Sequence, residues 1–312
     1  METADCWAGA APPSGGYIFL SHTPPPGGSP ARRSYNRLSR FTLNDGATFI
    51  ARSSESVLIN QFDEHEWHNG GDLFFGSDSF LYVAVGDEGD LGEVFNNAQK
   101  INGGFFSGVL RIDVDRDAAR SHPIRRQPQA GGAVPAGWPA TFSQKDYSPN
   151  DSPWVDAAGS QLEEFFAIGL RSPHRMTFDA ASGKALIGDV GQEAYEEVNV
   201  LAKGPGGGPK TKPASVSGTE TAPSYSYSHA GGGACVIGGP VYRGSRLPGS
   251  LIGRYIFGDY VSGRIWSLDW QTPGAQPVQL LQIAGSSLSG FSVDANNEIH
   301  LCTLGTSGKI YK

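Results

Sequence analysis

The sequence predicts an all-β protein built as a β-propeller, and three observations carry this prediction. Short segments in which apolar and polar residues alternate recur along the chain, whereas a helical period of about 3.6 residues is hard to find. The 312 residues include 43 Gly and 21 Pro, which is too many turn-forming residues for a bundle of helices. The third observation is a sequence phrase that returns at wide and fairly even spacing.

That phrase consists of an apolar pair, a turn of Gly, Asp or Asn, and then an alternating strand. It occurs at Phe74–Asp87, Met176–Asp189 and Phe291–Thr303, with a looser copy at Tyr255–Leu268. Repeated hairpins of this kind are typical of propeller blades, in which a four-stranded sheet recurs about every 40 to 50 residues. A β-sandwich also offers short strands and frequent turns. The regular return of the phrase favours the propeller.

The candidate strands have Gly, Pro, Asp or Asn at their ends, as expected for antiparallel hairpins. They lie at residues 16–23, 37–43, 72–87, 107–115, 163–170, 175–191, 196–201, 238–244, 253–270, 278–285 and 290–312. Two segments rich in Pro, Gly, Ser and Thr interrupt the pattern, residues 118–160 and 203–223. We expect both to be surface loops inserted within one domain. That domain is expected to span residues 16–312, after a Pro/Gly-rich leader at residues 1–15.

The formal net charge of -7 argues against a general affinity for nucleic acid or anionic membranes, since an acidic surface attracts neither. Clustered acids could instead bind a cation. The N-terminal segment carries acids where a secretory signal has basic residues, and no apolar run reaches the roughly 18 residues of a membrane-spanning helix. Cys6, Cys235 and Cys302 form no CxxC motif, so a disulfide is possible but zinc is not indicated.

The first candidate for chemistry is His68, which stands in the sequence HNGGD at the entrance to a strand. It could act as a general base, since the two following glycines would let a ligand approach closely, or it could be a surface loop residue. Asp87 ends the same strand in VGDEGD, where it could stabilise a protonated His68 or form an ordinary Asp-Gly turn. His65 and His68 could also form a metal pair, although their spacing in a loop supports this only weakly.

Three arginines are candidates for binding anions. Arg171 follows an apolar strand, where it could bind an oxygen that gains charge in a reaction or form a salt bridge at the rim. Arg243 and Arg264 lie in apolar strands, where they could hold the carboxylates of an acidic cofactor or form rim salt bridges. Arg175 begins a strand and is expected to be structural. An acidic turn could supply calcium ligands or be a solvated face: Asp189, Glu193, Glu196 and Glu197.

Several of these segments, taken in order, resemble the soluble quinoprotein sugar dehydrogenases, the glucose/sorbosone dehydrogenase family. The resemblance spans about Gly16 to Lys312 and rests on HNGGDLFFGSDSFLYVAVGDEGD, FFSGVLRIDVD, FFAIGLRSPHRMTFD, IGDVGQEAYEEVNVL, YSYSHAGGGACVIGGPVYRG and GRYIFGDYVSGRIW. It implies a six-bladed propeller that binds pyrroloquinoline quinone and calcium and oxidises the anomeric carbon of an aldose. It also implies a periplasmic or secreted protein that passes electrons to a quinone, a cytochrome or a dye.

On this resemblance His68 is the base that takes the sugar hydroxyl proton while hydride passes to the quinone, and Asp87 orients that base. Arg171 would stand beside the reactive quinone carbonyl, where a fixed cation favours the developing negative charge. Ser172 would lie next to it in the cofactor's surroundings. The resemblance also implies that the backbone carbonyls of Gly191 and Gln192 bind calcium. Arg243 and Arg264 would bind the carboxylates of the cofactor.

The sequence departs from the family's pattern in three places. Ser172 stands where the family usually has Asn, AKGPGGGPKTKP replaces a Gly-Asn-Tyr-Gly-Trp turn, and the chain begins late, which predicts that the first blade is missing. The missing first blade and Ser172 favour an alternative, a non-catalytic binding module like the similar domain of the hedgehog-interacting protein. A third hypothesis is a calcium-dependent hydrolase that uses His68 without a quinone. The joint presence of His68, Asp87 and Arg171 favours the dehydrogenase.

Overall fold

The computed structural model describes residues 5–8, 17–22, 34–43, 50–65, 67–89, 91–201, 204–205, 220–283, 285, 287–305 and 308–312. For residues 5–8, 17–22 and 204–205 it describes the backbone alone. Of these described residues, the helical ones form three 3-10 helices, Arg52–Ser54, His229–Gly231 and Gly249–Leu251. No described helix is long and apolar enough to span a membrane. The regular secondary structure of the described chain is thus almost wholly β-strand, as the sequence predicts.

The described strands form five sheets of three to five strands each and one two-stranded sheet. The first sheet comprises β1 (Asp5–Ala8), β2 (Tyr17–His22), β3 (Ser34–Thr42), β4 (Ser56–Asp63) and β9 (Phe142–Ser143). The second comprises β15 (Gly204–Pro205), β11 (Phe165–Ile168), β7 (Gly108–Ile112), β6 (Leu81–Val85) and β5 (Leu73–Phe75). Neighbouring strands are antiparallel, except that β15 is parallel to β11.

The later sheets are simpler. The third comprises β12 (Pro173–Asp179), β13 (Lys184–Asp189), β14 (Tyr195–Val200) and β16 (Tyr225–Ser228). The fourth comprises β17 (Val236–Ile237), β18 (Tyr255–Asp259), β19 (Arg264–Leu268) and β20 (Val278–Gln282). The fifth comprises β21 (Ser287–Val293), β22 (Ile299–Leu304) and β23 (Ile310–Tyr311), and the two-stranded sheet pairs β8 (Ser121–Pro123) with β10 (Tyr147–Pro149).

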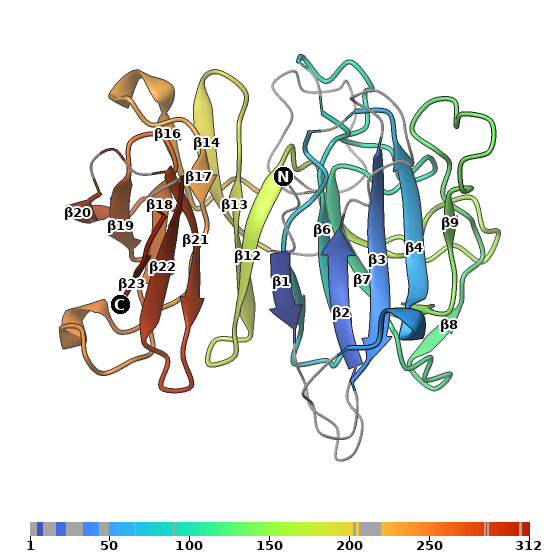
Figure 1. Ribbon diagram of the computed structural model, residues 1–312, viewed down its shortest axis with the longest axis horizontal. Helices are drawn as coiled ribbons and strands as arrows, with labels where there is room; N and C mark the ends of the chain where they lie inside the picture. The colour runs from blue at the N-terminus through green and yellow to red at the C-terminus, as the bar shows by residue number, and fades with distance from the viewer. Residues whose placement is uncertain are drawn as a thin grey trace.

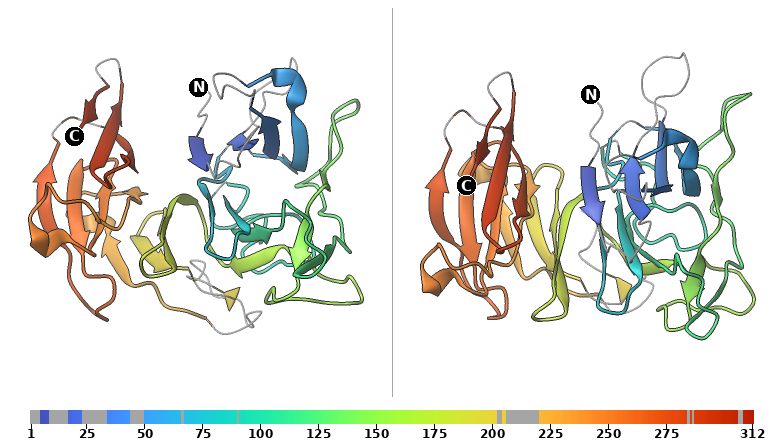
Figure 2. Two further views of the ribbon diagram at one scale, coloured as in Figure 1. Left: turned by 90° about the horizontal axis from the view of Figure 1, so that it is seen from below. Right: turned by 60° about the horizontal axis from the view of Figure 1, so that its bottom comes forward.

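The five sheets follow one another around an arc, from the blue N-terminal strands through the green and yellow strands to the red C-terminal strands (Figure 2). Figure 1 shows β12 and β13 between the N-terminal and C-terminal sheets. Neighbouring sheets contact one another through their first strands at β1–β5, β5–β12 and β17–β21, and β17 also contacts β13 and β14 of the third sheet. This succession of antiparallel sheets is a β-propeller arrangement and confirms the predicted fold class. The number of six blades stays a prediction.

Each pair of neighbouring sheets encloses a hydrophobic cluster, because successive side chains of a strand point to opposite faces. In β6, Leu81 and Val83 belong to the cluster shared with the first sheet, whereas Tyr82 and Ala84 belong to the cluster shared with the third. Two further clusters join the third sheet to the fourth and the fourth to the fifth. Burying one large aliphatic side chain stabilises a fold by about 1.5–3 kcal/mol, so these clusters hold the arc together.

The recurring sequence phrase forms a hairpin at each of its four positions, as predicted. Phe74–Asp87 contains β5 and β6, Met176–Asp189 contains most of β12 and β13, and Phe291–Thr303 contains parts of β21 and β22. The looser copy, Tyr255–Leu268, is the hairpin of β18 and β19. The alternation that these segments share is therefore that of paired antiparallel strands, which are largely buried in β6, β13 and β18 but partly exposed in β21 and β22.

The boundaries of the domain differ from the expectation. Residues Asp5–Ala8, inside the expected leader, form β1 and pair with β2. The expected surface insertion at residues 118–160 contains three strands, β8, β9 and β10, and β9 joins the first sheet at the outer edge of β4. The other expected insertion, residues 203–223, lies mostly outside the described residues.

The strand register brings several loops to one end of the second and third sheets. Val85 pairs with Gly108, and Asp189 pairs with both Pro173 and Glu197, so the chain leaves β6 and β13 at the same end where it enters β7, β12 and β14. Backbone hydrogen bonds tie the loops together there, from Ser107 N–H to the Gly86 carbonyl at 2.7 Å and from Val190 N–H to the Ser172 carbonyl at 3.0 Å. The candidate site is built at this end.

Candidate active site

The side chains of His68 and Asp87 form a hydrogen-bonded pair at this end of the second sheet. His68 Nδ1 lies 2.6 Å from Asp87 Oδ1, and the two side chains are 14% and 5% exposed. A neutral imidazole that donates its Nδ1 hydrogen to a carboxylate presents Nε2 as the accepting nitrogen. Asp87 therefore fixes the orientation of the ring and stabilises any positive charge that the ring acquires.

Glycines let the loops around this pair approach closely. His68 has a φ of 58°, and its carbonyl oxygen packs on Gly86, where a Cβ atom would overlap it. A positive φ at a residue with a side chain costs about 1–3 kcal/mol and occurs often at functional sites. Gly70 has a φ of 103°, a conformation that residues with a side chain rarely adopt. The close backbone packing thus explains why glycines surround His68.

Arg171 is fixed against the same loop. Its carbonyl accepts a hydrogen bond from the Asp87 N–H at 2.9 Å. Its guanidinium donates from Nη1 to the carbonyls of Val190 and Gly191, at 3.0 and 2.9 Å. Backbone carbonyls that follow β13 therefore set the position of the charged group before any ligand binds.

Asp189, the last residue of β13, anchors the loop that contains Arg171. Its carboxylate accepts hydrogen bonds from the N–H groups of Arg171 at 3.0 Å and Ser172 at 2.7 Å. Burial raises the pKa of Asp189 to about 7, and the charges of Glu197 and Asp87 act in the same direction, whereas the two N–H groups lower it. Asp189 thus changes its charge close to neutral pH.

A second histidine–carboxylate pair supports the turn that contains Gly191. His229 Nε2 lies 2.6 Å from Glu196 Oε1, and Glu196 Oε2 accepts hydrogen bonds from the N–H groups of Gly191 at 3.3 Å and Val236 at 2.9 Å. Burial raises the pKa of Glu196. The sequence reasoning selected Glu196 as part of an acidic turn but missed His229. The pair joins β14 to the end of β16 across 33 residues, so no spacing in the sequence announces it.

A cavity of about 560 Å³ opens beside these groups. Its lining includes Asp87, Arg171, Asp189, Gly191 and Gln192, which come from the second and third sheets. Arg171 is the cation among the described lining residues, and burial raises the pKa of two of the lining acids, Glu93 and Glu197. The described wall is acidic overall, with carboxyl groups from Asp87, Glu93, Asp189, Glu193, Glu197 and Glu220.

The donor atoms of this wall fit a hard cation, because calcium prefers carbonyl and carboxylate oxygens. Gly191 offers its carbonyl, and Gln192 offers a side-chain oxygen that accepts a hydrogen bond from Gly92 N–H at 2.8 Å. No group of three or more His, Cys, Asp or Glu side chains in the described part of the chain is placed to hold a metal ion. A calcium ion at this wall would therefore depend on carbonyls and water for part of its ligands.

A quinone that carries carboxylates fits the same cavity only together with a cation. The volume is ample, since cofactor and ligand sites commonly occupy about 300–1,000 Å³. The wall, however, offers Arg171 as its described cation among several acids, so a bare polycarboxylate would be repelled. A bound calcium ion would supply the missing positive charge. The wall thus fits the quinone and calcium as a pair.

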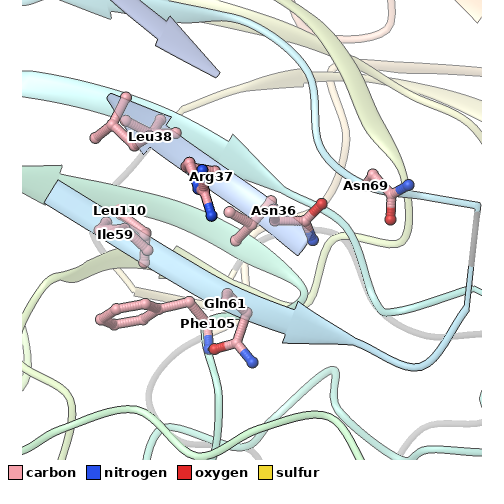
Figure 3. A pocket seen from close by; sticks show the side chains of 10 residues that line it. Asn36, Arg37, Leu38, Ile59, Gln61, Asn69, Phe105 and Leu110 are labelled. Atoms are coloured by element: carbon pink, nitrogen blue, oxygen red, sulfur yellow. The ribbon is translucent and has the colours of Figure 1, made fainter. Parts of the chain in front are cut away.

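A second cavity, between the first and second sheets, is too small for a cofactor. It measures about 10 Å³, which is close to the space of a single water molecule. The residues that line it come from β3, β4, β6, β7 and the loops before β5 and β7, and they include Asn36, Gln61 and Asn69 (Figure 3). This cavity is a small packing gap with a polar edge.

The structure brings together six of the eight residues that the sequence proposes for the site. Asp87, Arg171, Gly191 and Gln192 line the cavity, whereas His68 and Ser172 are not among its lining residues and adjoin it through hydrogen bonds to Asp87 and Asp189. Arg264 begins β19 of the fourth sheet, and its Nη1 donates at 2.8 Å to the carbonyl of Gly231, which belongs to the same 3-10 helix as His229. Arg264 does not line the cavity.

Arg243 does not join the site either. Its Nε and Nη2 donate to the two carboxylate oxygens of Asp179, at 3.0 and 2.6 Å. Asp179 pairs with Lys184, at the opposite end of β12 from the Pro173–Asp189 pair. Arg243 therefore forms the salt bridge that the sequence left open as its alternative, and it stands at the wrong end of the third sheet to reach the cavity.

Two other expectations concern histidine and cysteine. The ring of His65 packs edge-on against Trp67, with centroids 5.0 Å apart. Cys235 and Cys302 are free thiols, and the side chain of Cys6 lies outside the described residues. Burial raises the pKa of Cys235 to about 12, so this thiol stays protonated and is not an activated nucleophile.

Comparison with known proteins finds no matching family model. The sequence is 28% identical over 222 residues to the HIPL1 protein of Arabidopsis thaliana, which covers 64% of this chain and 29% of that protein. It is 27% identical over 278 residues to the HIPL2 protein of Arabidopsis thaliana, covering 75% of this chain and 38% of the relative. The human Hedgehog-interacting protein is 27% identical over 282 residues, and the alignment covers 82% of this chain and 34% of that protein. The alignments thus cover 29–38% of the length of these relatives.

Solved structures resemble the whole arc. A glucose dehydrogenase superposes with a TM-score of 0.65 over 94% of this chain and 76% of its own, at 20% identity. The fold is that of the β-propeller sugar dehydrogenases. The soluble aldose sugar dehydrogenase of Escherichia coli gives a TM-score of 0.61 at 14% identity, over 94% and 77% of the chains. The aldose sugar dehydrogenase of Streptomyces coelicolor, solved with PQQ bound, gives a TM-score of 0.53 at 13% identity, over 99% of this chain and 96% of its own.

Proposed function

We propose that this protein is a quinoprotein dehydrogenase that oxidises an aldose at its anomeric carbon, with pyrroloquinoline quinone and calcium as cofactors. The observation that carries the proposal is the His68–Asp87 pair, whose carboxylate lines the same cavity as the Arg171 guanidinium. An oriented base beside a fixed cation is what removal of a proton and a hydride from one carbon requires. Sugar dehydrogenases are among the solved proteins that share the fold.

His68 acts as the base in the proposed reaction. Its Nε2 takes the proton of the anomeric hydroxyl, since Nδ1 is engaged by Asp87 at 2.6 Å. The bound quinone supplies the acceptor for the hydride that leaves the same carbon. The sugar loses one proton and one hydride, with its two electrons, and becomes a lactone. Asp87 keeps the imidazolium stable until His68 returns its proton to solvent.

Arg171 and the turn after β13 hold the reactants. The Arg171 guanidinium, already fixed by two carbonyls, favours negative charge that develops on an oxygen beside it. Gly191 and Gln192 would hold calcium, and Glu196 keeps the Gly191 backbone in place. Ser172 would lie at the edge of the cofactor. The chain's own residues thus position the base, the cation and the metal ligands.

The resemblance to the family extends the proposal to the protein's surroundings. We place the protein in the periplasm or outside the cell, where such a cofactor is usually acquired. Electrons would pass from the reduced cofactor to a quinone, a cytochrome or a dye. The aldose itself would be selected by the loops around the cavity.

A titration of the purified chain with pyrroloquinoline quinone and calcium tests the proposal, followed by dye reduction over a panel of aldoses. We expect saturable binding that needs calcium, because the acidic wall repels the quinone alone, and dye reduction that depends on the sugar. Binding without turnover over the full panel would contradict the enzymatic function. The absence of binding by a chain with a cooperative unfolding transition would contradict both cofactor and function.

The second candidate function is a non-catalytic binding module. The observation in its favour is that HIPL proteins and Hedgehog-interacting proteins are among the sequence relatives, at 27–28% identity. The acidic wall of the cavity also suits a cationic ligand. A folded chain that binds no quinone, with or without calcium, would make this candidate the stronger one.

A further inference from the structure

The connection between the third and fourth sheets, residues 229–236, adjoins the turn that contains Gly191. It begins with the 3-10 helix His229–Gly231, directly after β16, and ends at Val236, where β17 begins. Residues of this connection do not line the described wall of the cavity. Any effect of the connection on the site is therefore indirect, through the groups that it holds in place.

His229 attaches to the segment after Gly191 at two points. Its backbone N–H donates to the Ala194 carbonyl at 3.0 Å, and its Nε2 lies 2.6 Å from Glu196 Oε1. The antiparallel pairing of β14 with β16, which lie side by side in Figure 1, brings the histidine to this place. Because Nε2 contacts a carboxylate oxygen, it carries the hydrogen and donates it. The imidazole thus holds one oxygen of Glu196.

The other oxygen of Glu196 holds the turn. The Glu196 side chain is fully buried, and its Oε2 accepts hydrogen bonds from Gly191 N–H at 3.3 Å and from Val236 N–H at 2.9 Å. A buried carboxylate with partners on both oxygens is held in one orientation, because an unpaired oxygen would be costly. The Gly191 backbone also packs so closely on the Tyr195 carbonyl that a Cβ atom would overlap it. A rotation of Glu196 would therefore release the Gly191 N–H.

The short helix is itself fixed from the fourth sheet. Arg264, at the start of β19, donates from Nη1 to the Gly231 carbonyl at 2.8 Å. Tyr227, two residues before His229, donates its hydroxyl hydrogen to Asp259 Oδ2 at 2.7 Å, where β18 ends. The position of His229 thus depends on two strands of the neighbouring sheet.

The turn at the other end of this series of contacts belongs to the cavity wall. Arg171 Nη1 donates to the carbonyls of Val190 and Gly191 at 3.0 and 2.9 Å, so these carbonyls set the place of the guanidinium. Gly191 and Gln192 are also the residues proposed to hold calcium. One turn therefore positions both the cation of the wall and the proposed metal ligands.

We propose that His229 and Arg264 are positioning residues of the site. Arg264 holds the helix, His229 holds Glu196, and Glu196 holds the Gly191 turn against Arg171. Arg264 would thus serve the site from outside the cavity, in place of the direct cofactor contact that the resemblance implies. The effect on calcium and quinone rests on the proposed function, whereas the effect on the turn does not.

The chain offers a matched control for a purely structural role. His122 Nε2 lies 2.8 Å from Glu163 Oε2, and these side chains are 13% and 2% exposed, against 18% and 0% for His229 and Glu196. His122 belongs to the two-stranded sheet of β8 and β10. In Figure 1, β8 lies at the right-hand side, away from β14 and β16. Removal of either imidazole takes a partner from a buried carboxylate, but the Gly191 turn adjoins the His229 pair.

Hydrogen exchange of backbone amides, read by mass spectrometry of short peptides, tests the positioning without any cofactor. In His229→Ala we expect the Gly191 amide to exchange roughly tenfold faster, because its acceptor is no longer held. His122→Ala should leave the exchange of this amide unchanged. His229→Gln should restore most of the protection, since glutamine keeps an N–H donor for Glu196.

Arg264→Gln tests whether the arginine acts through the histidine. Alone it should speed exchange of the Gly191 amide several-fold, and added to His229→Ala it should cause no further increase. Effects that multiply in the double variant would overturn the role of Arg264. If His229→Ala has no cooperative unfolding transition, Arg264→Gln and His229→Gln provide the same comparison.

A quinone titration in calcium then measures the effect on the site. We expect the dissociation constant to rise about tenfold in His229→Ala and to stay near that of the unmodified chain in His229→Gln. If the unmodified chain binds no quinone, the proposed function fails, and the exchange comparison still decides the positioning. Unchanged exchange in His229→Ala, or equally fast exchange in His122→Ala, would overturn the proposal. Unchanged quinone binding beside a faster-exchanging turn would overturn it as well.

Discussion

The side chains of His68 and Asp87 meet at 2.6 Å although 19 residues separate them in the sequence. They stand at the two ends of the β5–β6 hairpin, which folds back on itself and brings its entrance beside its exit. The proposed base and the carboxylate proposed to orient it are thereby carried by one hairpin. The first predictions concern this pair.

Replacing His68 by asparagine should lower the rate of sugar oxidation by about 10²–10⁴-fold, because the amide cannot accept the hydroxyl proton. Quinone binding should change little. Dye reduction and a quinone titration measure the two effects separately. The control is His300→Asn on the fifth sheet, which should behave like the unmodified chain. Full turnover in His68→Asn would remove this residue from the mechanism.

Replacing Asp87 by asparagine should lower kcat by roughly 10–100-fold while KM changes less, since the imidazolium loses a negative partner. The amide keeps the shape of the group and can still accept the hydrogen bond from Gly89 N–H, now 3.0 Å long. Steady-state kinetics across pH, together with the unfolding temperature, distinguish the roles. A loss of folding without a selective loss of kcat would indicate a purely structural carboxylate.

The two arginines Arg171 and Arg243 should respond in opposite ways to replacement by glutamine. Arg171→Gln should weaken the quinone titration and turnover, because the cation of the cavity wall is lost. Arg243→Gln should leave both unchanged but lower the free energy of unfolding by about 2 kcal/mol, since it strands the buried Asp179. A weakened quinone titration in Arg243→Gln would mean that its contact with Asp179 is not its main role.

The Arg243 variant also has a pH signature. Although burial alone raises the pKa of Asp179, hydrogen bonds from Arg243 and Ser182 lower the net pKa below its ordinary value of 3.8. Because the pKa is lower in the folded state, the ionised carboxylate contributes stability above pH 3.8. This contribution is lost as pH falls through the pKa of the folded state. Denaturant unfolding between pH 3 and 7 should therefore show a smaller acid loss in Arg243→Gln. Identical slopes would show that the ion pair is not coupled to stability.

Asp63→Asn should make stability less dependent on pH. Burial raises the pKa of Asp63 in the folded chain well above its ordinary value of 3.8. The contribution of this carboxyl group to stability is therefore fully present below pH 3.8, and it is lost as pH rises through the pKa of the folded state. The loss is about 1.4 kcal/mol for each unit by which the pKa is raised. Between pH 4 and 8, the free energy of unfolding of the variant, measured with urea, should thus rise relative to that of the unmodified chain.

The contacts of Asp63 allow this replacement. Its Oδ1 accepts from His65 N–H at 2.8 Å, a bond that an amide oxygen can keep. Its Oδ2 accepts from Asn36 Nδ2 at 3.1 Å, and Asn36 Oδ1 has no partner among the described residues. A rotated Asn36 amide could therefore accept from the new amide nitrogen. A variant that loses stability equally at every pH would contradict this reading.

The sequence was sufficient for the four hairpins of the recurring phrase and for the loop glycines, but it missed β4, an 8-residue strand outside every candidate segment. Alternation in Phe74–Asp87 and Met176–Asp189 predicts strands, because side chains alternate with a period of two only in a β-strand. Gly86 marks the place where the His68 backbone approaches closely. The sequence could not predict β1 and β9, since each consists of a few residues that become a strand only beside a longer partner. Short edge strands take their structure from the sheet that they join.

Local pattern therefore determined the all-β fold and selected His68, Asp87 and Arg171, because each stands at a recognisable strand end. Tertiary structure decided which charges meet. Arg243 pairs with Asp179 across 64 residues, and His229 pairs with Glu196 across 33, according to which ends of neighbouring strands coincide. That choice depends on strand direction and register, which long-range pairing between sheets fixes and no local spacing records.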